Sequence, residues 1–223
     1  MNSEPALNAG VLDPSVAARA WAYGWAISRR TPAPVQRTGY FEISVGKPEQ
    51  TTRYVLPGLD RKLLQELVAE VGPGSWLKIC APLAPVSRWL SPHWDVHEPE
   101  FLMSTDLMGG DAAVPEGYRL QTEKVGAVVI ASLIADSGEI AASGQIAIDG
   151  PFATFDQIVT AEAHRRKGLG RRIMSSLSDI ALDHGARQGV LVATEAGAAL
   201  YKAMGWSLVS PITAASLPSA QAG

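Results

Sequence analysis

The sequence contains a single cysteine, Cys80, among its 223 residues. One cysteine excludes an intramolecular disulfide and is typical of proteins from reducing compartments. A long apolar run is also missing, because the longest, 125–135, is too short to span a bilayer and contains Ser132. Residues 1–10 lack the basic and apolar regions of a signal peptide. We therefore expect a soluble, cytoplasmic protein that has no membrane partner.

The charge composition has no excess of either sign. There are 19 Lys and Arg residues against 22 Asp and Glu residues, for a net charge of −3, so no global basic field favours nucleic acid. His93 and His97 lie four residues apart near Asp95 and Glu98, but without a His-Glu-x-x-His order or a third ligand. We expect neither a nucleic-acid partner nor a metal.

The first half of the chain has the pattern of a small α/β unit. Asp13-Pro14 is a helix start, and the helix is expected to run to about Ser28. From 83 to 117 the chain is rich in Pro, Trp and Gly and gives no clear prediction, and 108–116 is the expected linker. Apolar periodicity and turn residues predict the remaining order, which is strands at 41–45 and 51–56, a helix capped by Asp60, and a strand at 76–81.

The second half is expected to begin with an antiparallel meander. Strands are predicted at 128–135, 140–148 and 154–160, separated by turn residues. A helix follows whose apolar face holds Leu169, Ile173, Leu177 and Ile180, and after it comes a short buried strand at 189–194. The Ala, Ser and Pro-rich tail after Pro211 has the composition of a low-complexity segment.

The most informative segment is Thr160–Gly170, which joins a predicted strand to a predicted helix. A turn at this place directs backbone N–H groups at one point, where the helix N-terminus adds partial positive charge. Gly168 and Gly170 leave room for a ligand, and the basic residues from Arg165 to Lys167 add full charges. The sequence therefore predicts an anion site suited to a pyrophosphate.

The pattern Arg165-x-x-Gly168-x-Gly170 resembles the acyl-CoA signature of the GNAT superfamily of N-acetyltransferases. A second motif of that family is similar to residues 195–206, a short helix that carries Tyr201 and ends in Gly205-Trp206. Both motifs occur in the family order. The resemblance covers roughly the C-terminal half of the chain.

The resemblance implies an α/β fold of the α+β type, with a mixed, mostly antiparallel twisted sheet flanked by helices. Residues 111–223 are expected to form a GNAT-like acetyltransferase domain. Residues 1–110 are expected to form an N-terminal α/β region. That region is either a divergent or degenerate copy of the same fold or a separate unit, and it could contribute to the acceptor site.

The resemblance also implies a function, that of an acetyl-CoA-dependent N-acetyltransferase with acetyl-CoA as cosubstrate. The acetyl group would pass to a primary amine, on a small molecule, by direct attack in a ternary complex. Pantetheine would run along the strand that ends at Thr160, in a splay between this strand and 189–193. At Thr194 the family often has Asn, which leaves the local cofactor contact in doubt. The predicted cofactor-binding residues are Ile158, Val159, Thr160, Arg165, Arg166, Lys167, Gly168, Leu169, Gly170, Arg171, Thr194 and Tyr201.

Two residues are candidates for proton transfer. Tyr201 is the candidate general acid, since a phenol can protonate the leaving thiolate, and the alternative is a tyrosine packed in the core. Asp156 is the candidate base, expected on the same strand face as Thr154 and Ile158. The alternative for Asp156 is a carboxylate that solvates a strand end. Weaker candidates for the base are Glu195 and Glu123.

Other functions stay open at this point. A non-catalytic acyl-CoA-binding sensor or regulatory module would use the same basic turn. A protein lysine or N-terminal acetyltransferase would use the same chemistry. Neither the acceptor nor the oligomeric state follows from the sequence.

Overall fold

The computed structural model describes residues 11–110 and 113–219. Residues 1–10, in which no signal peptide is expected, lie outside the described residues. Residues 111–112, which belong to the expected linker, also lie outside them. No helix in the described ranges has the length and apolar character that crossing a membrane requires.

The first region follows the predicted order, with extra short elements. The carboxylate of Asp13 accepts hydrogen bonds from the backbone N–H groups of Ser15 and Val16, which fixes the start of the first helix. Asp60 caps the second helix in the same way. The elements are α1 (Pro14–Arg29), β1 (Val35–Arg37), β2 (Tyr40–Lys47), β3 (Gln50–Leu56), α2 (Arg61–Glu70), β4 (Ser75–Ile79), α3 (Leu83–Val86), a 3₁₀ turn η1 (Ser87–Trp89), β5 (Asp95–Val96) and β6 (Glu100–Asp106).

The second region contains the predicted meander and the two predicted helices. Its first strand, β7, was not predicted. The elements are β7 (Tyr118–Val125), β8 (Val128–Ala135), β9 (Ile140–Asp149), β10 (Phe152–Thr160), a 3₁₀ turn η2 (Glu162–His164), α4 (Leu169–Asp183), β11 (Gln188–Thr194), α5 (Glu195–Lys202) and β12 (Ser207–Ser216).

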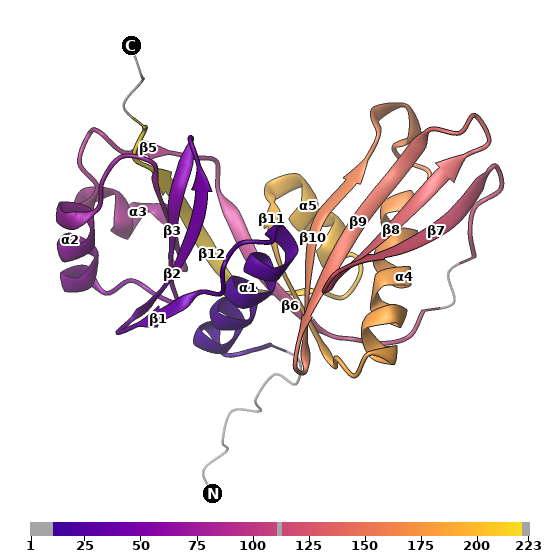
Figure 1. Ribbon diagram of the computed structural model, residues 1–223, viewed down its shortest axis with the longest axis horizontal. Coiled ribbons are helices and arrows are strands. Elements are labelled where there is room, and N and C mark those ends of the chain that lie inside the picture. The colour runs from indigo at the N-terminus through magenta and orange to yellow at the C-terminus, as the bar shows by residue number, and fades with distance from the viewer. Residues whose placement is uncertain (1–10, 111–112, 220–223) are drawn as a thin grey trace, which may run out of the picture.

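The strands of the described residues form one twisted sheet of 12 strands. In Figure 1, β6 and β12 lie between the other strands of the first region and those of the second. The order of the sheet is β1-β2-β3-β4-β12-β6-β11-β10-β9-β8-β7, and β5 pairs with β12 beside this path. The pairs β3–β4 and β10–β11 are parallel, and the other pairs are antiparallel. The mixed, mostly antiparallel sheet flanked by helices confirms the predicted fold class.

The middle of the sheet consists of two strands that the sequence did not reveal. β6, in the stretch 83–117, lies between β11 and β12. β12 pairs with β6 and then with β4, so the prediction of a low-complexity segment after Pro211 was wrong as far as Ser216. The two regions thus share one sheet, and the boundary at residue 110 stays a prediction about independent folding.

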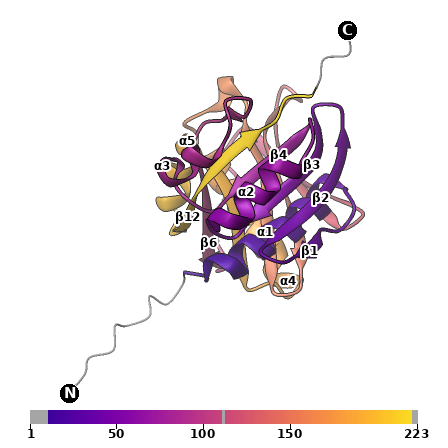
Figure 2. The same cartoon turned by 90° about the vertical axis from the view of Figure 1, so that its left-hand side faces the viewer.

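Helices α1 and α4 pack on opposite faces of the meander. α4 contacts β8, β9 and β10, whereas α1 contacts β9 and β10 through the other face. Gly24 lets α1 approach closely, because a Cβ at this position would lie 1.9 Å from the Oγ1 atom of Thr154. In Figure 2, α2 lies in front of the strands of the first region.

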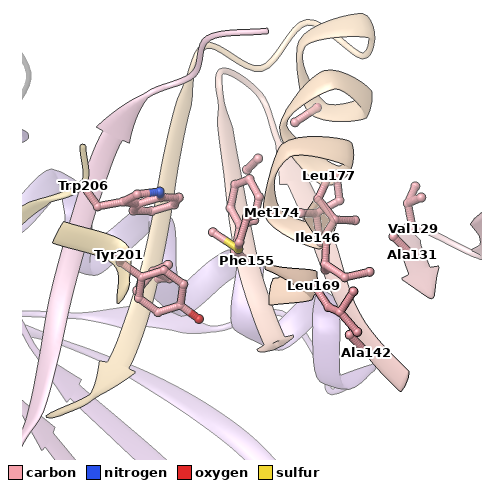
Figure 3. Packing of buried hydrophobic residues seen from close by; sticks show 14 of the residues in the cluster. Val129, Ala131, Ala142, Ile146, Phe155, Leu169, Met174, Leu177, Tyr201 and Trp206 are labelled. Carbon is pink, nitrogen blue, oxygen red and sulfur yellow. The ribbon is translucent and has the colours of Figure 1, made fainter. Parts of the chain in front are cut away.

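The core beneath α4 continues across the sheet to β11 and α5 (Figure 3). Phe155 of β10 meets Trp206 edge to face, with ring centroids 5.2 Å apart. Gly189 of β11 makes this pair possible, since a Cβ there would lie 2.8 Å from the Trp206 ring. The core therefore fixes β10 relative to β11 at the place where the two strands begin to separate.

Candidate active site

A groove opens between the parallel strands β10 and β11. The two strands pair only from Phe152–Gln188 to Thr154–Val190, although β10 continues to Thr160 and β11 to Thr194. This divergence confirms the predicted splay. The groove has a volume of about 210 Å³ and is lined by Phe155, Asp156, Gln157, Ile158, Leu191, Val192, Ala193, Thr194, Gly197 and Tyr201.

A bulge in β10 decides which side chains face the groove. The register with β9 shifts between Asp156 and Val159, and Gln157 has a φ of 55°. Thr154 and Asp156 face α1, to which both are hydrogen-bonded, whereas Ile158 packs with the α4 core. The expectation that Asp156 and Ile158 share a face was therefore wrong, because the bulge reverses the alternation.

The basic turn connects β10 to α4 through η2. Gly168 precedes the first residue of α4 with a φ of 76°, a left-handed conformation that favours glycine. Within the part of the chain that the structure describes, the backbone N–H groups of residues 166–171 donate to no protein acceptor. The side chains of Arg165, Arg166 and Lys167 are exposed around them. Free N–H groups with surrounding cations fit a phosphate-bearing ligand.

His164 holds this turn in place. Its Nδ1 atom lies 2.8 Å from the hydroxyl of Tyr118, and its Nε2 atom is hydrogen-bonded to the carboxylate of Glu139. Lys167 also reaches the Tyr118 hydroxyl, at 3.2 Å. The imidazole therefore fastens the turn to β7 and to the β8–β9 connection.

The other predicted cofactor residues have more varied environments. Leu169 is buried in the core, so only its backbone can face a ligand. Val159 is 59% exposed, and Arg171 donates to the carbonyl of Ala203 at 3.3 Å. Thr194 caps α5 by accepting from the N–H of Gly197 at 3.3 Å.

Gly170 and Thr160 stand at the base of the basic turn. A Cβ on Gly170 would lie 3.6 Å from the Oγ1 atom of Thr160 and 3.6 Å from Leu200 of α5. Both are ordinary contact distances, so a small side chain fits there.

Tyr201 lies on α5 with its ring in the core and its hydroxyl at the groove. The residue is 8% exposed, and its hydroxyl has no hydrogen-bond partner among the described residues. In Figure 3 the hydroxyl points away from Trp206. Burial, assisted by the negative charge of Asp156, raises the pKa of Tyr201 to about 12. The phenol is therefore a proton donor at neutral pH.

Asp156 lines the groove and is hydrogen-bonded to Ser28 and Arg29 at the end of α1. Its Oδ2 atom accepts from Ser28 Oγ at 2.6 Å and from Arg29 Nε at 2.6 Å. Its Oδ1 atom accepts from Arg29 Nη2 at 2.9 Å and from the N–H of Gln157 at 2.9 Å. Four donors fill the usual acceptor positions of a carboxylate.

A second hollow, which we call the inner pocket, continues from Asp156 away from α5. It has a volume of about 160 Å³ and shares Phe155, Asp156 and Val192 with the groove. Sequence reasoning missed its polar residues because they come from distant elements. The full lining is Trp21, Trp25, Arg29, Arg53, Lys78, Glu100, Phe155, Asp156 and Val192.

Lys78 and Glu100 form an ion pair in the inner pocket. Lys78 is 5% exposed, and burial lowers its pKa to about 8 despite the attraction of Glu100. The weaker candidates for the base lie elsewhere. Glu123 is on β7, which β8 and β9 separate from β10, and Glu195 is in the exposed first turn of α5.

The remaining candidates from the sequence lie away from the groove. His97 stacks on Trp76 at 4.5 Å and lies 2.8 Å from the hydroxyl of Ser216. Among residues 11–110 and 113–219, no three His, Cys, Asp or Glu side chains are grouped as metal ligands. Another cavity, of about 460 Å³, lies between α4 and segments 105–110 and 204–206, and it shares no lining residue with the groove.

The comparisons with known proteins agree with this geometry. The family model described as "Acetyltransferase (GNAT) family" matches residues 93–206, slightly more than half of the chain. The chain therefore belongs to the GNAT acetyltransferase family. A search of curated proteins finds no match.

Several solved structures share the fold at low sequence identity. A GCN5-related N-acetyltransferase from Kribbella flavida is 13% identical with a TM-score of 0.66, and the match covers 95% of this chain and 98% of that one. A putative GNAT acetyltransferase from Novosphingobium aromaticivorans is 16% identical with a TM-score of 0.58, over 94% and 100% of the two chains. A GCN5-related N-acetyltransferase from Sphaerobacter thermophilus is 12% identical with a TM-score of 0.58, and the match covers 79% of this chain and 76% of that one. These likenesses show the fold, across almost the whole chain in the first two.

Proposed function

We propose that the protein transfers an acetyl group from acetyl-CoA to a primary amine of a small molecule, by direct attack in a ternary complex. The observation that carries this proposal is the groove between β10 and β11. One of its walls, β10, leads directly into the unpaired N–H groups of the basic turn, and the Tyr201 hydroxyl borders its interior. When bound, acetyl-CoA supplies a thioester carbonyl carbon, at which a C–N bond forms while the C–S bond breaks.

The residues present fit the cofactor. The N–H groups of residues 166–171 and the charges of Arg165, Arg166 and Lys167 would hold its phosphates. Beyond Thr154, the edge of β10 that faces β11 pairs with no described strand, so its backbone groups are available to pantetheine amides. The separation of the two strands makes room for that arm.

Tyr201 is the proposed general acid. Its hydroxyl borders the groove, and its raised pKa keeps the proton on the phenol until the CoA thiolate forms. The phenol oxygen would give its proton to the leaving sulfur, and the resulting phenolate would regain a proton from the attacking nitrogen, which loses one as the amide forms. The aromatic ring would keep its place in the core during this transfer, since Trp206 packs beside it with centroids 6.0 Å apart.

Asp156 is proposed to act through its position. The carboxylate lies where the groove meets the inner pocket, and its ion pair fixes Arg29 beside the proposed site of attack. Its four hydrogen bonds leave no free acceptor position, and a direct proton acceptor would have to release one donor. We therefore infer that the amine loses its proton to water in the inner pocket.

A CoA titration and an amine screen test this proposal together. Calorimetry and a thermal shift measure CoA binding, and thiol release from acetyl-CoA with a panel of primary amines measures transfer. We expect CoA to raise the melting temperature and thiol release to depend on the amine. A CoA shift without amine-dependent thiol release would favour the non-catalytic binding module. No shift at millimolar CoA would contradict the cofactor assignment itself.

A further inference from the structure

The inner pocket opens into a third hollow, the outer pocket, at the end of α1. The outer pocket has a volume of about 160 Å³ and shares Trp25, Arg29 and Arg53 with the inner pocket. The groove, the inner pocket and the outer pocket therefore adjoin one another in that order, each sharing lining residues with the next. The outer pocket is lined by Trp25, Arg29, Arg30, Thr31, Val45, Lys47, Gln50 and Arg53.

The outer pocket is lined by cations without a counter-charge. Arg29, Arg30, Lys47 and Arg53 line it, and none of its lining residues is acidic. Arg29 is already neutralised by Asp156. Arg30, Lys47 and Arg53 have no carboxylate within salt-bridge distance in the described part of the chain.

Arg53 is the most informative of these cations because it is buried. The residue is 8% exposed, and its guanidinium lies 3.8 Å from the centroid of the Trp25 ring. With its amide oxygen turned to this arginine, Gln50 accepts from Nε at 2.9 Å and from Nη2 at 3.1 Å. Nη1 donates to no described residue. A buried guanidinium without an ion-pair partner carries a desolvation cost, which a bound anion would offset.

Two nearby carboxylates do not serve as ion-pair partners of Arg53. Glu100 and Asp156 both line the inner pocket, but Lys78 and Arg29 respectively neutralise them. Burial lowers the pKa of Arg53 to about 10, although the negative charges of Glu100 and Asp156 act to raise it. The positive charge around Arg53 is therefore available to a ligand.

We propose that the acceptor is an amine that also carries an anionic group, and that the outer pocket binds this group through Arg53, Arg30 and Lys47. This inference rests on the proposed function and names its substrate class. The amino group lies beside Asp156 at the groove, and the anion lies beyond Trp25. A carboxylate and a phosphate both suit a guanidinium fork, and the experiment distinguishes them.

Matched acceptors test the proposal. A series of ω-amino carboxylates of increasing length is compared with the corresponding carboxamides, and aminoalkyl phosphates are compared with amino alcohols. Transfer is measured as kcat/KM by thiol release. We expect the best anionic acceptor to exceed its neutral counterpart by at least about tenfold, since hydrogen bonds to charged groups are the strong ones. The carboxylate and phosphate series identify which anion fits.

Two variants assign the preference to the outer pocket. We expect Arg53→Met to remove most of the anion preference, and Lys47→Gln, at an exposed residue, to reduce it without affecting folding. Arg61→Gln, on exposed α2, is the matched control and should keep the preference. A CoA thermal shift of normal size in each variant shows that the fold and the cofactor site are intact. Equal kcat/KM values for neutral and anionic acceptors, or a preference that survives Arg53→Met and Lys47→Gln, would overturn the proposal.

A binding measurement separates this inference from the proposed function. With saturating CoA present to fill the basic turn, each ω-amino carboxylate and aminoalkyl phosphate of the series is titrated by thermal shift. If no amine is turned over, the proposed function fails, but a shift with the anionic probe that Lys47→Gln weakens still supports the anion site. No shift with any anionic probe in wild-type protein contradicts the anion site, even if neutral amines are acetylated.

Discussion

Arg29 and Asp156 join the end of α1 to the bulge of β10. Nε and Nη2 of the guanidinium donate to the two carboxylate oxygens at 2.6 and 2.9 Å, across 127 residues of sequence. The arginine also lines the inner pocket, as do Trp21 and Trp25 from the same helix. The N-terminal region therefore builds the side of the candidate site that lies opposite the basic turn and Tyr201.

Asp156→Asn removes this ion pair while keeping the shape of the side chain. We expect the free energy of unfolding to fall by about 1–3 kcal/mol, because Arg29 loses charge-assisted hydrogen bonds in a partly buried place. The KM for the amine should rise more than kcat falls, since Arg29 is no longer held in place beside the pocket that receives the amine. Urea unfolding and steady-state kinetics measure both effects.

The control for this variant is Asp149→Asn. Asp149 pairs with Arg19 of the same helix at 3.9 Å, but both side chains are more than a third exposed, so a change below about 0.5 kcal/mol is expected. A loss in kcat of about a hundredfold in Asp156→Asn, with loss of the acidic limb of the pH profile, would instead identify Asp156 as the direct base.

Gly24→Ala tests how closely α1 must approach β10. The new methyl group would lie 1.9 Å from the hydroxyl oxygen of Thr154, a buried residue, so the helix has to shift. We expect a loss of about 1–3 kcal/mol, although alanine is the better helix former. Gly58→Ala is the control, because a Cβ there meets nothing within 4 Å. Equal melting temperatures for the two variants would contradict the close contact.

The local patterns of the sequence were sufficient to predict the basic turn and the helix of Tyr201, which form the proposed cofactor side. Asp13 and Asp60 are N-cap residues, and they predict where their helices begin. The basic turn and the helix of Tyr201 are each a motif of consecutive residues. Each of these signals depends on residues within about one helical turn of one another. These local patterns predicted the elements, whereas the splay between β10 and β11 was expected only from the resemblance to the GNAT family.

The acceptor side could not be predicted in this way. Strand β12 contains Pro211, which argues against a central strand, and a register shift between Leu208 and Ser210 accompanies it there. The inner pocket joins Arg53 of β3 to Glu100 of β6, and these residues meet only through the sheet order. The positive φ of Gln157 places Asp156 and Ile158 on opposite faces of β10. The alternation of apolar and polar residues does not predict this change of face.

Gly170→Glu should remove CoA binding while leaving the fold intact. The first atom of the new side chain makes only ordinary contacts, and an acidic residue in the first turn suits the helix dipole. Its carboxylate, however, would occupy the region of the phosphates. Calorimetry should show CoA affinity lowered by at least about a hundredfold.

Two further variants separate size from charge at this position. Gly170→Ala should bind CoA nearly as wild type does, and Gly170→Gln should give an intermediate affinity. Gly168 is less suitable, because its φ of 76° makes any side chain strained. Normal CoA binding by Gly170→Glu would locate the cofactor elsewhere.

Tyr201→Phe should lower kcat without weakening CoA binding. The ring stays in the core, and only the proton donor is lost, so the effect falls on the transition state. A loss of about tenfold to a hundredfold is expected. Because the pKa of Tyr201 is raised to about 12, the phenol stays protonated below that value. The loss should therefore be the same factor at every pH from about 6 to 10. A factor that vanishes above about pH 9 would show that the phenol ionises earlier and that its pKa is not raised.

The most direct test of the central claim is acetyl transfer by the purified protein. Primary amines are incubated with acetyl-CoA carrying a labelled acetyl group, and products are read by mass spectrometry for wild type and for Gly170→Glu. The account predicts an amine that gains the labelled acetyl group with wild-type protein, one free thiol for each product, and neither with Gly170→Glu. No acetylated amine from wild type, or equal product from the variant, would contradict acetyl transfer at this groove.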